Sequence, residues 1–200
     1  MKKIFYLFIA LLFTSVGCNQ PAKKYYTSGE LKYNLKDYRG AIVDYTKSIE
    51  YNPNNPDAYC NRGLAKRSLQ DNVGAIADYT KAIELDPTYR PYLNRGLTKR
   101  NLQDLRGTIA DYNKAIEINP TLSKAFYNRG LAKSDLQDYR GSIADYTTAI
   151  EFNPIYADAY FFRGLSKIEL GQKDSGCLDL SKAGELGLEL AYETIKIYCQ

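Results

Sequence analysis

The chain has 200 residues, of which 27 are Lys or Arg and 23 are Asp or Glu, so its formal net charge is +4. This near balance disfavours nucleic acid as a partner. The chain contains no His, the commonest side chain in acid–base catalysis and metal binding, which disfavours an enzyme. Apolar and charged residues are evenly distributed without a long polar linker, so we expect one elongated domain.

Residues 1–17 have the order of a secretory signal peptide. Lys2 and Lys3 precede ten apolar residues, Ile4 to Phe13, and small residues follow them. As a helix, this apolar run would be about 15 Å long, which is half of a bilayer core. We therefore expect residues 1–17 to be removed on export rather than to span a membrane.

Cys18 follows a small residue, and this junction resembles the lipobox of bacterial lipoproteins. The resemblance implies a mature protein that begins at Cys18 and carries a diacylglyceryl group and a fatty acid, with membrane attachment through that anchor. Residues 18–21 would form a tether, reaching at most about 15 Å. The expected location is the bacterial cell envelope, anchored to the outer membrane and facing the periplasm or the outside. The alternative is an ordinary cleaved signal, with Cys18 incidental.

After the tether, a pattern of residues recurs every 33 or 34 positions. In the second copy Tyr59 precedes a glycine, and Tyr79, Ala82 and Pro87 follow. The third copy repeats these positions. The glycines of the five copies are Gly29, Gly63, Gly96, Gly130 and Gly164. A period of this size indicates stacked copies of one unit that cannot bury its apolar face alone.

The pattern of an aromatic residue, Gly, Ala, Tyr, Ala and Pro resembles the tetratricopeptide repeat, from residue 22 to about 186. The resemblance implies an all-α fold: a right-handed superhelical solenoid of five helix pairs with a concave inner face. The expected repeats are residues 22–55, 56–89, 90–122, 123–156 and 157–187. Residues 188–200 would hold a capping helix, because Leu188 to Tyr198 is amphipathic.

Two sets of recurring polar residues are expected to serve the scaffold. The first set is placed to cap the second helix of its pair: Asp37, Asp71, Asp104 and Asp138. The second set combines an Arg and a Lys four residues apart with an Asp on the second helix, as in Arg129, Lys133 and Asp145. We expect ion pairs within or between repeats, rather than a basic stripe that binds nucleic acid.

The third copy is one residue shorter than the second, because Arg90-Pro91-Tyr92 replaces a four-residue stretch of the second copy. Pro91 suits the first turn of a helix, so the helix should form. We expect a local change in the angle between repeats at this point.

The cysteines after Cys18 have no metal-binding or redox spacing. Cys60 and Cys177 suit small apolar core positions. A turn near Leu188 would bring Cys177 and Cys199 to the same end of two antiparallel helices, so a disulfide between them is possible if the helix rotation allows it.

The family resemblance places a binding groove along the first helices of the pairs. The residues expected there are Tyr26, Tyr33, Leu64, Arg67, Leu93, Leu97, Arg100, Tyr127, Leu131 and Phe161. Aromatic and Leu anchors beside Arg67 and Arg100 suit a partly apolar peptide or protein segment with an acidic group. The alternative is that several of them only pack between adjacent helices.

The sequence thus predicts a non-enzymatic scaffold for protein–protein contacts, an exported lipoprotein of the envelope. No residue cluster breaks the repeats as a catalytic site should, so we expect no catalytic residue, cofactor, metal or small-molecule substrate. The alternative function is a subunit that binds glycan or peptidoglycan, using some of the 19 tyrosines as stacking surfaces.

Overall fold

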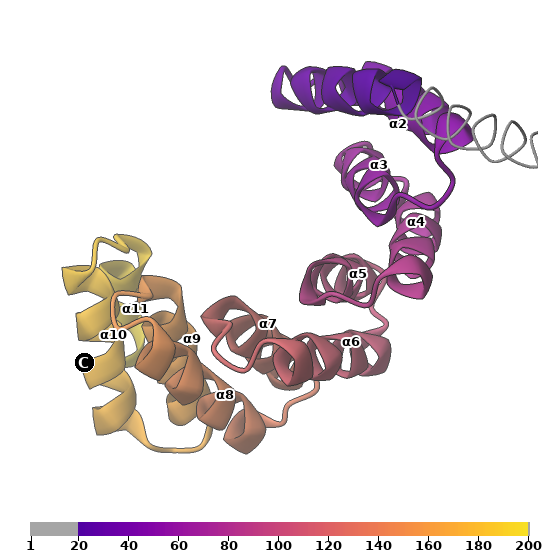
Figure 1. Ribbon diagram of the computed structural model, residues 1–200. Helices are drawn as coiled ribbons and strands as arrows, with labels where there is room; N and C mark the ends of the chain where they lie inside the picture. The colour runs from indigo at the N-terminus through magenta and orange to yellow at the C-terminus, as the bar shows by residue number, and fades with distance from the viewer. Residues whose placement is uncertain (1–19, 200) are drawn as a thin grey trace, which may run out of the picture. The chain divides into compact units, whose positions relative to one another are not determined.

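Figure 1 shows a computed structural model of the protein, in which residues 20–199 are described. All regular secondary structure in these residues is helical, as expected. The described chain divides into two compact units between Pro87 and Thr88, whereas the sequence led us to expect one domain. The division is understandable because a helix in such an array contacts mainly its neighbours in sequence.

The first unit holds two helix pairs. They are the helix over residues 20–34 with α2 (Tyr38–Tyr51), and α3 (Pro56–Ser68) with α4 (Asn72–Leu85). Helix α3 packs against both α2 and α4, so the second pair adds to the first by contact between neighbours. The predicted signal peptide, Cys18 and most of the tether lie outside the described residues. Among residues 20–199, no helix is both long and apolar enough to span a membrane.

The second unit holds three further pairs and one last helix. The pairs are α5 (Tyr89–Asn101) with α6 (Leu105–Ile118), α7 (Ser123–Asp135) with α8 (Tyr139–Phe152), and α9 (Ala157–Glu169) with α10 (Lys173–Glu185), followed by α11 (Leu190–Tyr198). Each helix packs on the next, and α7 also contacts α5 and α9. The first helices of neighbouring pairs therefore lie side by side within this unit.

The second helices of the first four pairs begin at aspartate caps. The carboxylate of Asp104 accepts a hydrogen bond from the N–H of Gly107 at 2.9 Å, and the same bond recurs at Asp37, Asp71 and Asp138. The predicted caps are therefore confirmed. The glycine at the third helical position is part of this arrangement, because a Cβ on Gly107 would collide with the Asp104 carboxylate.

The turn inside each pair contains one residue in the left-handed region. At Lys36, Gln70, Gln103 and Gln137 φ lies between 61° and 64°, and at Gly171 it is 75°. Hydrogen bonds from Gln103 N–H to Arg100 O (2.9 Å) and from Asp104 N–H to Lys99 O (3.0 Å) close the end of α5. This is the usual way in which a left-handed residue satisfies the last carbonyl groups of a helix.

The core is built around one buried tyrosine in each of the first four pairs. Tyr146 on α8 has no exposed surface, and Tyr45, Tyr79 and Tyr112 occupy the matching places. A Cβ on Gly130 of α7 would lie 2.7 Å from Cε1 of Tyr146, so only glycine lets the two helices approach this closely. In the fifth pair Leu180 replaces the tyrosine.

The short third copy is accommodated in the connection before α5. Helix α4 ends at Leu85 and α5 begins at Tyr89, which leaves a three-residue link (86–88) where the later pairs have four (119–122 and 153–156). Pro91 lies in the first turn of α5, and the helix forms as predicted. The link coincides with the boundary between the units, and a changed angle there remains a prediction.

Helix α11 covers the end of the last pair. Ala191 and Ile195 pack against the cluster that holds Phe161 and Leu180, which matches the predicted capping helix. The Sγ atoms of Cys177 on α10 and Cys199 after α11 are bonded, with the Cα atoms 5.9 Å apart. The covalent link thus joins the cap to the helix it covers. Cys60 is buried in α3.

Candidate protein-binding surface

The most regular charged feature is a charge ladder of one Arg, one Lys and one Asp in each of the last four pairs. In the fourth pair, Nε and Nη2 of Arg129 donate to the two oxygens of Asp145 at 2.9 and 2.6 Å. Nζ of Lys133 lies 2.8 Å from the same carboxylate, whose side chain is only 5% exposed. The same triads are Arg62, Lys66 and Asp78; Arg95, Lys99 and Asp111; and Arg163, Lys167 and Asp179.

The ladder also joins neighbouring pairs. Nη1 of Arg129 donates to Oδ1 of Asn113 on the preceding second helix at 2.7 Å, and its guanidinium lies 5.4 Å from the ring centre of Phe126. Likewise, Nη1 of Arg163 donates to Oγ1 of Thr147 on the preceding second helix at 3.2 Å. The predicted Arg–Asp ion pairs are therefore confirmed within the helix pairs, and hydrogen bonds from the same arginines to neutral side chains join neighbouring pairs. The Arg and Lys side chains of the ladder are thus paired with groups of the protein itself, and we interpret the ladder as part of the scaffold.

The first pair replaces the ladder arginine with Ser28. Ser28 Oγ donates to Asp44 at 2.6 Å, and Lys32 Nζ lies 2.7 Å from the same carboxylate. Burial by itself would raise the pKa of Asp44, but the hydrogen bonds from Lys32 and Ser28 and the charge of Lys32 hold it below its usual range. The Asp44 carboxylate therefore stabilises the fold at pH values above the pKa that this carboxyl has in the unfolded chain. This stabilisation is lost as the pH falls through its lower pKa in the folded protein.

The ten predicted groove residues fall into two groups by exposure. Leu93, Leu131 and Phe161 are buried, with 6–8% exposure, and pack inside the molecule. The other seven are half-buried: Tyr26, Tyr33, Leu64, Leu97, Tyr127, Arg67 and Arg100. In the first unit Tyr26 and Tyr33 share a cluster with Tyr45. In the second unit Leu97 packs beside Leu93.

Arg100 and Asp135 join two neighbouring first helices. Nε of Arg100, at the end of α5, donates to Asp135 Oδ2, at the end of α7, at 2.7 Å. The two side chains are 32% and 38% exposed, and they border a depression with Asn101 and Gln103. The hydrogen bond and charge of Asp135 raise the pKa of Arg100 despite its partial burial. Sequence reasoning missed Asp135, although its separation of 35 residues, close to one repeat, was a usable signal.

Two arginines on first helices keep hydrogen-bond donors that the protein does not use. Within residues 20–199, the Nη atoms of Arg100 make no hydrogen bond, and the side chain of Arg67 makes neither a hydrogen bond nor an ion pair. The ladder residue Arg129, in contrast, uses Nε, Nη1 and Nη2. Because guanidinium groups bind carboxylates in a paired geometry, Arg67 and Arg100 are suited to an acidic partner group.

An aromatic cluster lies in the same unit as Arg100. The ring centre of Tyr127 on α7 is 4.8 Å from that of Tyr156, 6.0 Å from Tyr146 and 6.1 Å from Phe162. Burial raises the pKa of Tyr127, and it raises the pKa of Tyr156 to about 12. Sequence analysis identified Tyr127 but missed Tyr156 and Phe162, which are not among the residues that the family resemblance places in the groove.

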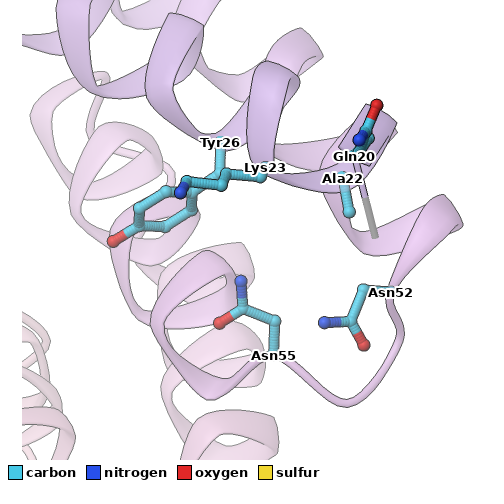
Figure 2. Close-up of a pocket in the computed structure, with 6 residues that line it drawn as sticks. All are labelled: Gln20, Ala22, Lys23, Tyr26, Asn52 and Asn55. Carbon is cyan, nitrogen blue, oxygen red and sulfur yellow. The ribbon is translucent and has the colours of Figure 1, made fainter. Parts of the chain in front are cut away.

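The first unit contains a small pocket near its amino end. Figure 2 shows Lys23 and Tyr26 of the first helix facing Asn52 and Asn55 of the loop after α2. Asn61 Nδ2 donates to Tyr26 Oη at 2.9 Å, and the Asn55 side chain caps α3 by accepting from Asp57 N–H at 3.1 Å. The polar groups around this pocket are thus largely engaged in holding the first two pairs together.

Among the described residues, no group of three or more Cys, Asp and Glu side chains is arranged to hold a metal ion. The charged and aromatic features described above are the candidate functional chemistry of residues 20–199. They suit contact with another macromolecule, through guanidinium donors and half-buried aromatic rings.

Comparison with family models identifies the family. A TPR repeat model matches residues 29–69, and models of the tetratricopeptide repeat match residues 56–89, 89–122 and 123–156. Together the matches run without a gap from residue 29 to 156. The chain therefore belongs to the tetratricopeptide repeat proteins, which confirms that part of the sequence-based identification. No curated protein sequence matches the chain.

Solved structures with similar folds include three that cover most of the chain. A crystal structure of MamA has a TM-score of 0.75 and 25% identity, covering 82% of this chain and 96% of that one. YrrB, described as a TPR protein with an unusual peptide-binding site, has a TM-score of 0.73 and 18% identity, covering 86% and 90%. PilF of Pseudomonas aeruginosa has a TM-score of 0.77 and 16% identity, covering 86% and 78%. The last two show likeness of fold alone.

Proposed function

We propose that the protein is a non-enzymatic scaffold that binds a peptide or protein segment through the first helices of its repeats. The observation that carries this proposal is the unused donor capacity of Arg67 and Arg100, on a fold whose ladder arginines, such as Arg129, are engaged within the protein. Half-buried Leu97 and Tyr127 supply apolar surface in the second unit. The preferred partner is therefore a partly apolar segment with a carboxylate.

The role as a scaffold agrees with the general use of this fold, and one fold neighbour is described as having a peptide-binding site. Glycan binding is the weaker candidate, because four of the 19 tyrosines are buried in the core. Tyr45, Tyr79, Tyr112 and Tyr146 are at most 1% exposed and offer no ring face to a sugar.

The test is capture of partners from detergent-solubilised membranes by wild-type and variant protein. Arg67→Glu and Arg100→Glu should each lose a protein partner, because a carboxylate would be repelled. Arg106→Glu makes the same charge change on the exposed side of a second helix and is the matched control. Glycan retained by all variants, without any protein partner, would favour the alternative function.

Asp135→Asn separates binding from stability. Loss of the ion pair should lower stability in both Arg100→Glu and Asp135→Asn, whereas binding should change in opposite directions. Asp135→Asn frees Arg100 for the partner's carboxylate, so we expect stronger capture, by about tenfold at most. Equal loss of capture in both variants would contradict the proposed role of Arg100.

The second part of the proposal concerns location. We propose that the protein is an exported lipoprotein of the bacterial envelope, anchored through Cys18 to the outer membrane. The order of basic, apolar and small residues before Cys18 supports this. Cys18→Ala should abolish incorporation of labelled fatty acid and stop processing, which globomycin should also block. Normal cleavage of the variant would instead indicate an ordinary signal peptide.

A further inference from the structure

The last helix exposes one apolar and acidic face. Leu190 and Ile197 on α11 are 59% and 73% exposed, and Glu193 lies between them. These residues are three and four positions apart, which places them on one side of the helix. The opposite side, with Ala191 and Ile195, packs on the cluster beneath. We define Glu189, Leu190, Glu193 and Ile197 as the C-terminal end face.

The first described helix exposes an apolar and basic face at the other end of the chain. Leu31 is 61% exposed, Leu35, just after the helix, is 71% exposed, and Lys23 and Lys24 are also exposed. Lys24 and Leu31 are seven positions apart and share one side of the helix, and Leu35 follows at its end. The other side packs inward, where Gly29 meets the ring of Tyr45. We define Lys23, Lys24, Leu31 and Leu35 as the N-terminal end face.

These two faces depart from the usual design of a repeat array, whose terminal repeats carry a polar outer face. Each face instead combines two large aliphatic side chains with two charged ones. The charges are opposite: lysines at the N-terminal end face and glutamates at the C-terminal one. Lys196 contacts Glu193 at 2.8 Å, but both side chains are more than 60% exposed, so the pair is weak and exchangeable.

We propose that the N-terminal end face of one copy of this protein packs against the C-terminal end face of another copy. The aliphatic residues would meet at the centre, and Lys23 and Lys24 would pair with Glu189 and Glu193 around them. Because the two faces differ, the contact is heterologous, and each added copy presents a new end face. Because each end face consists of only four residues, we expect the association to be weak. It would add self-assembly to the proposed scaffold role.

The test measures mass against concentration by sedimentation velocity. It uses the chain from residue 19, because this part contains all five buried clusters and lacks the apolar residues 4–13, which could self-associate. The weight-average mass should rise with concentration for the wild type. A mass that stays at that of one chain over the full concentration range would overturn the proposal.

Mixing of variants tests the head-to-tail geometry. Leu31→Gln/Leu35→Gln and Leu190→Gln/Ile197→Gln should each weaken self-association by about tenfold or more. An equimolar mixture should form one-to-one pairs that do not grow, because each variant supplies one intact face. The control is Val73→Gln on α4, an equally exposed aliphatic residue outside both faces (74%), which should leave association unchanged. Failure of the mixture to pair would overturn the proposal.

A charge exchange covers the possibility that the glutamine variants misfold. Lys24→Glu and Glu193→Lys should each weaken association, and the double variant should restore it, because opposite charges again face each other. Circular dichroism should be unchanged in all three. If Lys24→Glu lowered binding to vesicles of anionic lipid while no variant altered self-association, the N-terminal end face would be a membrane contact and the proposal would be wrong.

Discussion

Asp145 illustrates how this protein holds a charge inside a helix pair. The carboxylate is nearly buried, yet it receives three charge-assisted contacts, two from Arg129 and one from Lys133. A buried carboxylate is tolerated only when its oxygens are paired in this way, since the loss of solvation must be offset. The same reasoning applies to the other ladder aspartates.

Removing the Asp145 carboxylate should therefore destabilise the fold. Asp145→Ala leaves Arg129 and Lys133 partly buried without their partner, and we expect a loss of about 2–3 kcal/mol in the free energy of unfolding. Urea denaturation measures this loss. Glu151→Ala, an exposed carboxylate on the same helix, is the control and should change little. A double-mutant cycle between Arg129 and Asp145 that shows no coupling would contradict the assignment.

The buried tyrosines predict the response of the protein to high pH. Burial raises the pKa of Tyr156 from 10.0 to about 12 and also raises the pKa values of Tyr45, Tyr127 and Tyr146. A tyrosine whose pKa is higher in the folded than in the unfolded protein stabilises the fold fully at pH values below its unfolded-state pKa. This stabilisation is lost as the pH rises through its folded-state pKa. The free energy of unfolding should thus fall above about pH 10.

A titration followed by tyrosinate absorbance checks this expectation. The four tyrosines with raised pKa values should form a late group that ionises only at higher pH or on unfolding. Tyr156→Phe should remove one residue from this late group. Ionisation of all tyrosines in a single step near pH 10 while the protein is folded would refute the assignment.

At the level of elements, the turns inside the pairs are built with an unfavourable residue. A left-handed conformation costs about 1–2 kcal/mol for a residue with a Cβ, yet Gln occupies it in three pairs and Lys in one. Only the fifth pair uses Gly, at Gly171. The surrounding hydrogen bonds at the helix end hold the conformation in every pair.

Replacing the left-handed turn residue should raise the free energy of unfolding where Gly is introduced and lower it where Gly is removed. Gln103→Gly removes the steric penalty at φ 61°, so we expect a gain of roughly 1 kcal/mol, reduced by the greater freedom of Gly in the unfolded chain. Gly171→Gln makes the opposite change at φ 75° and should cost a similar amount. Thermal or urea unfolding distinguishes the two. Destabilisation by Gln103→Gly would show that its side chain has a contact that outweighs the penalty.

On the scale of the whole molecule, stability is a sum of local terms. Within each unit contacts run between successive helices and, in the second unit, between α7 and its neighbouring first helices, so no single core holds all the repeats. The ends of such an array unfold most easily because they have a neighbour on one side only. The cap α11 and its disulfide bond secure the C-terminal end.

Loss of the disulfide should loosen that end alone. The bond closes a segment of 22 residues, and Cys177→Ala/Cys199→Ala should lower local stability by about 3 kcal/mol on the chain-entropy model. Hydrogen exchange should quicken in α10 and α11 and stay unchanged in α5 and α6. A reductant should mimic the effect in the wild type and do nothing to the variant. Uniform quickening across all helices would contradict a stability built from local terms.

The sequence by itself determined the contacts that recur in each repeat. The cap aspartates, the glycine beside each core tyrosine and the Arg–Asp pairs appear at fixed separations, and the pairs are always 16 residues apart. Comparison of the copies with one another is therefore enough to identify these scaffold residues. The N-cap glycines and the left-handed Gln residues also recur, and closer comparison of the copies could have found them.

Only the tertiary structure decided which first-helix residues are buried and which remain available. From the sequence, both Leu93 and Leu97 were expected to line the groove. In the structure Leu93 is buried and Leu97 is half-buried, because exposure depends on how the helix is rotated against its neighbours. The same rotation brings Asp135 to Arg100 and Cys177 to Cys199. Contacts inside one repeat follow from local spacing, whereas contacts between repeats depend on the packing of several side chains at once.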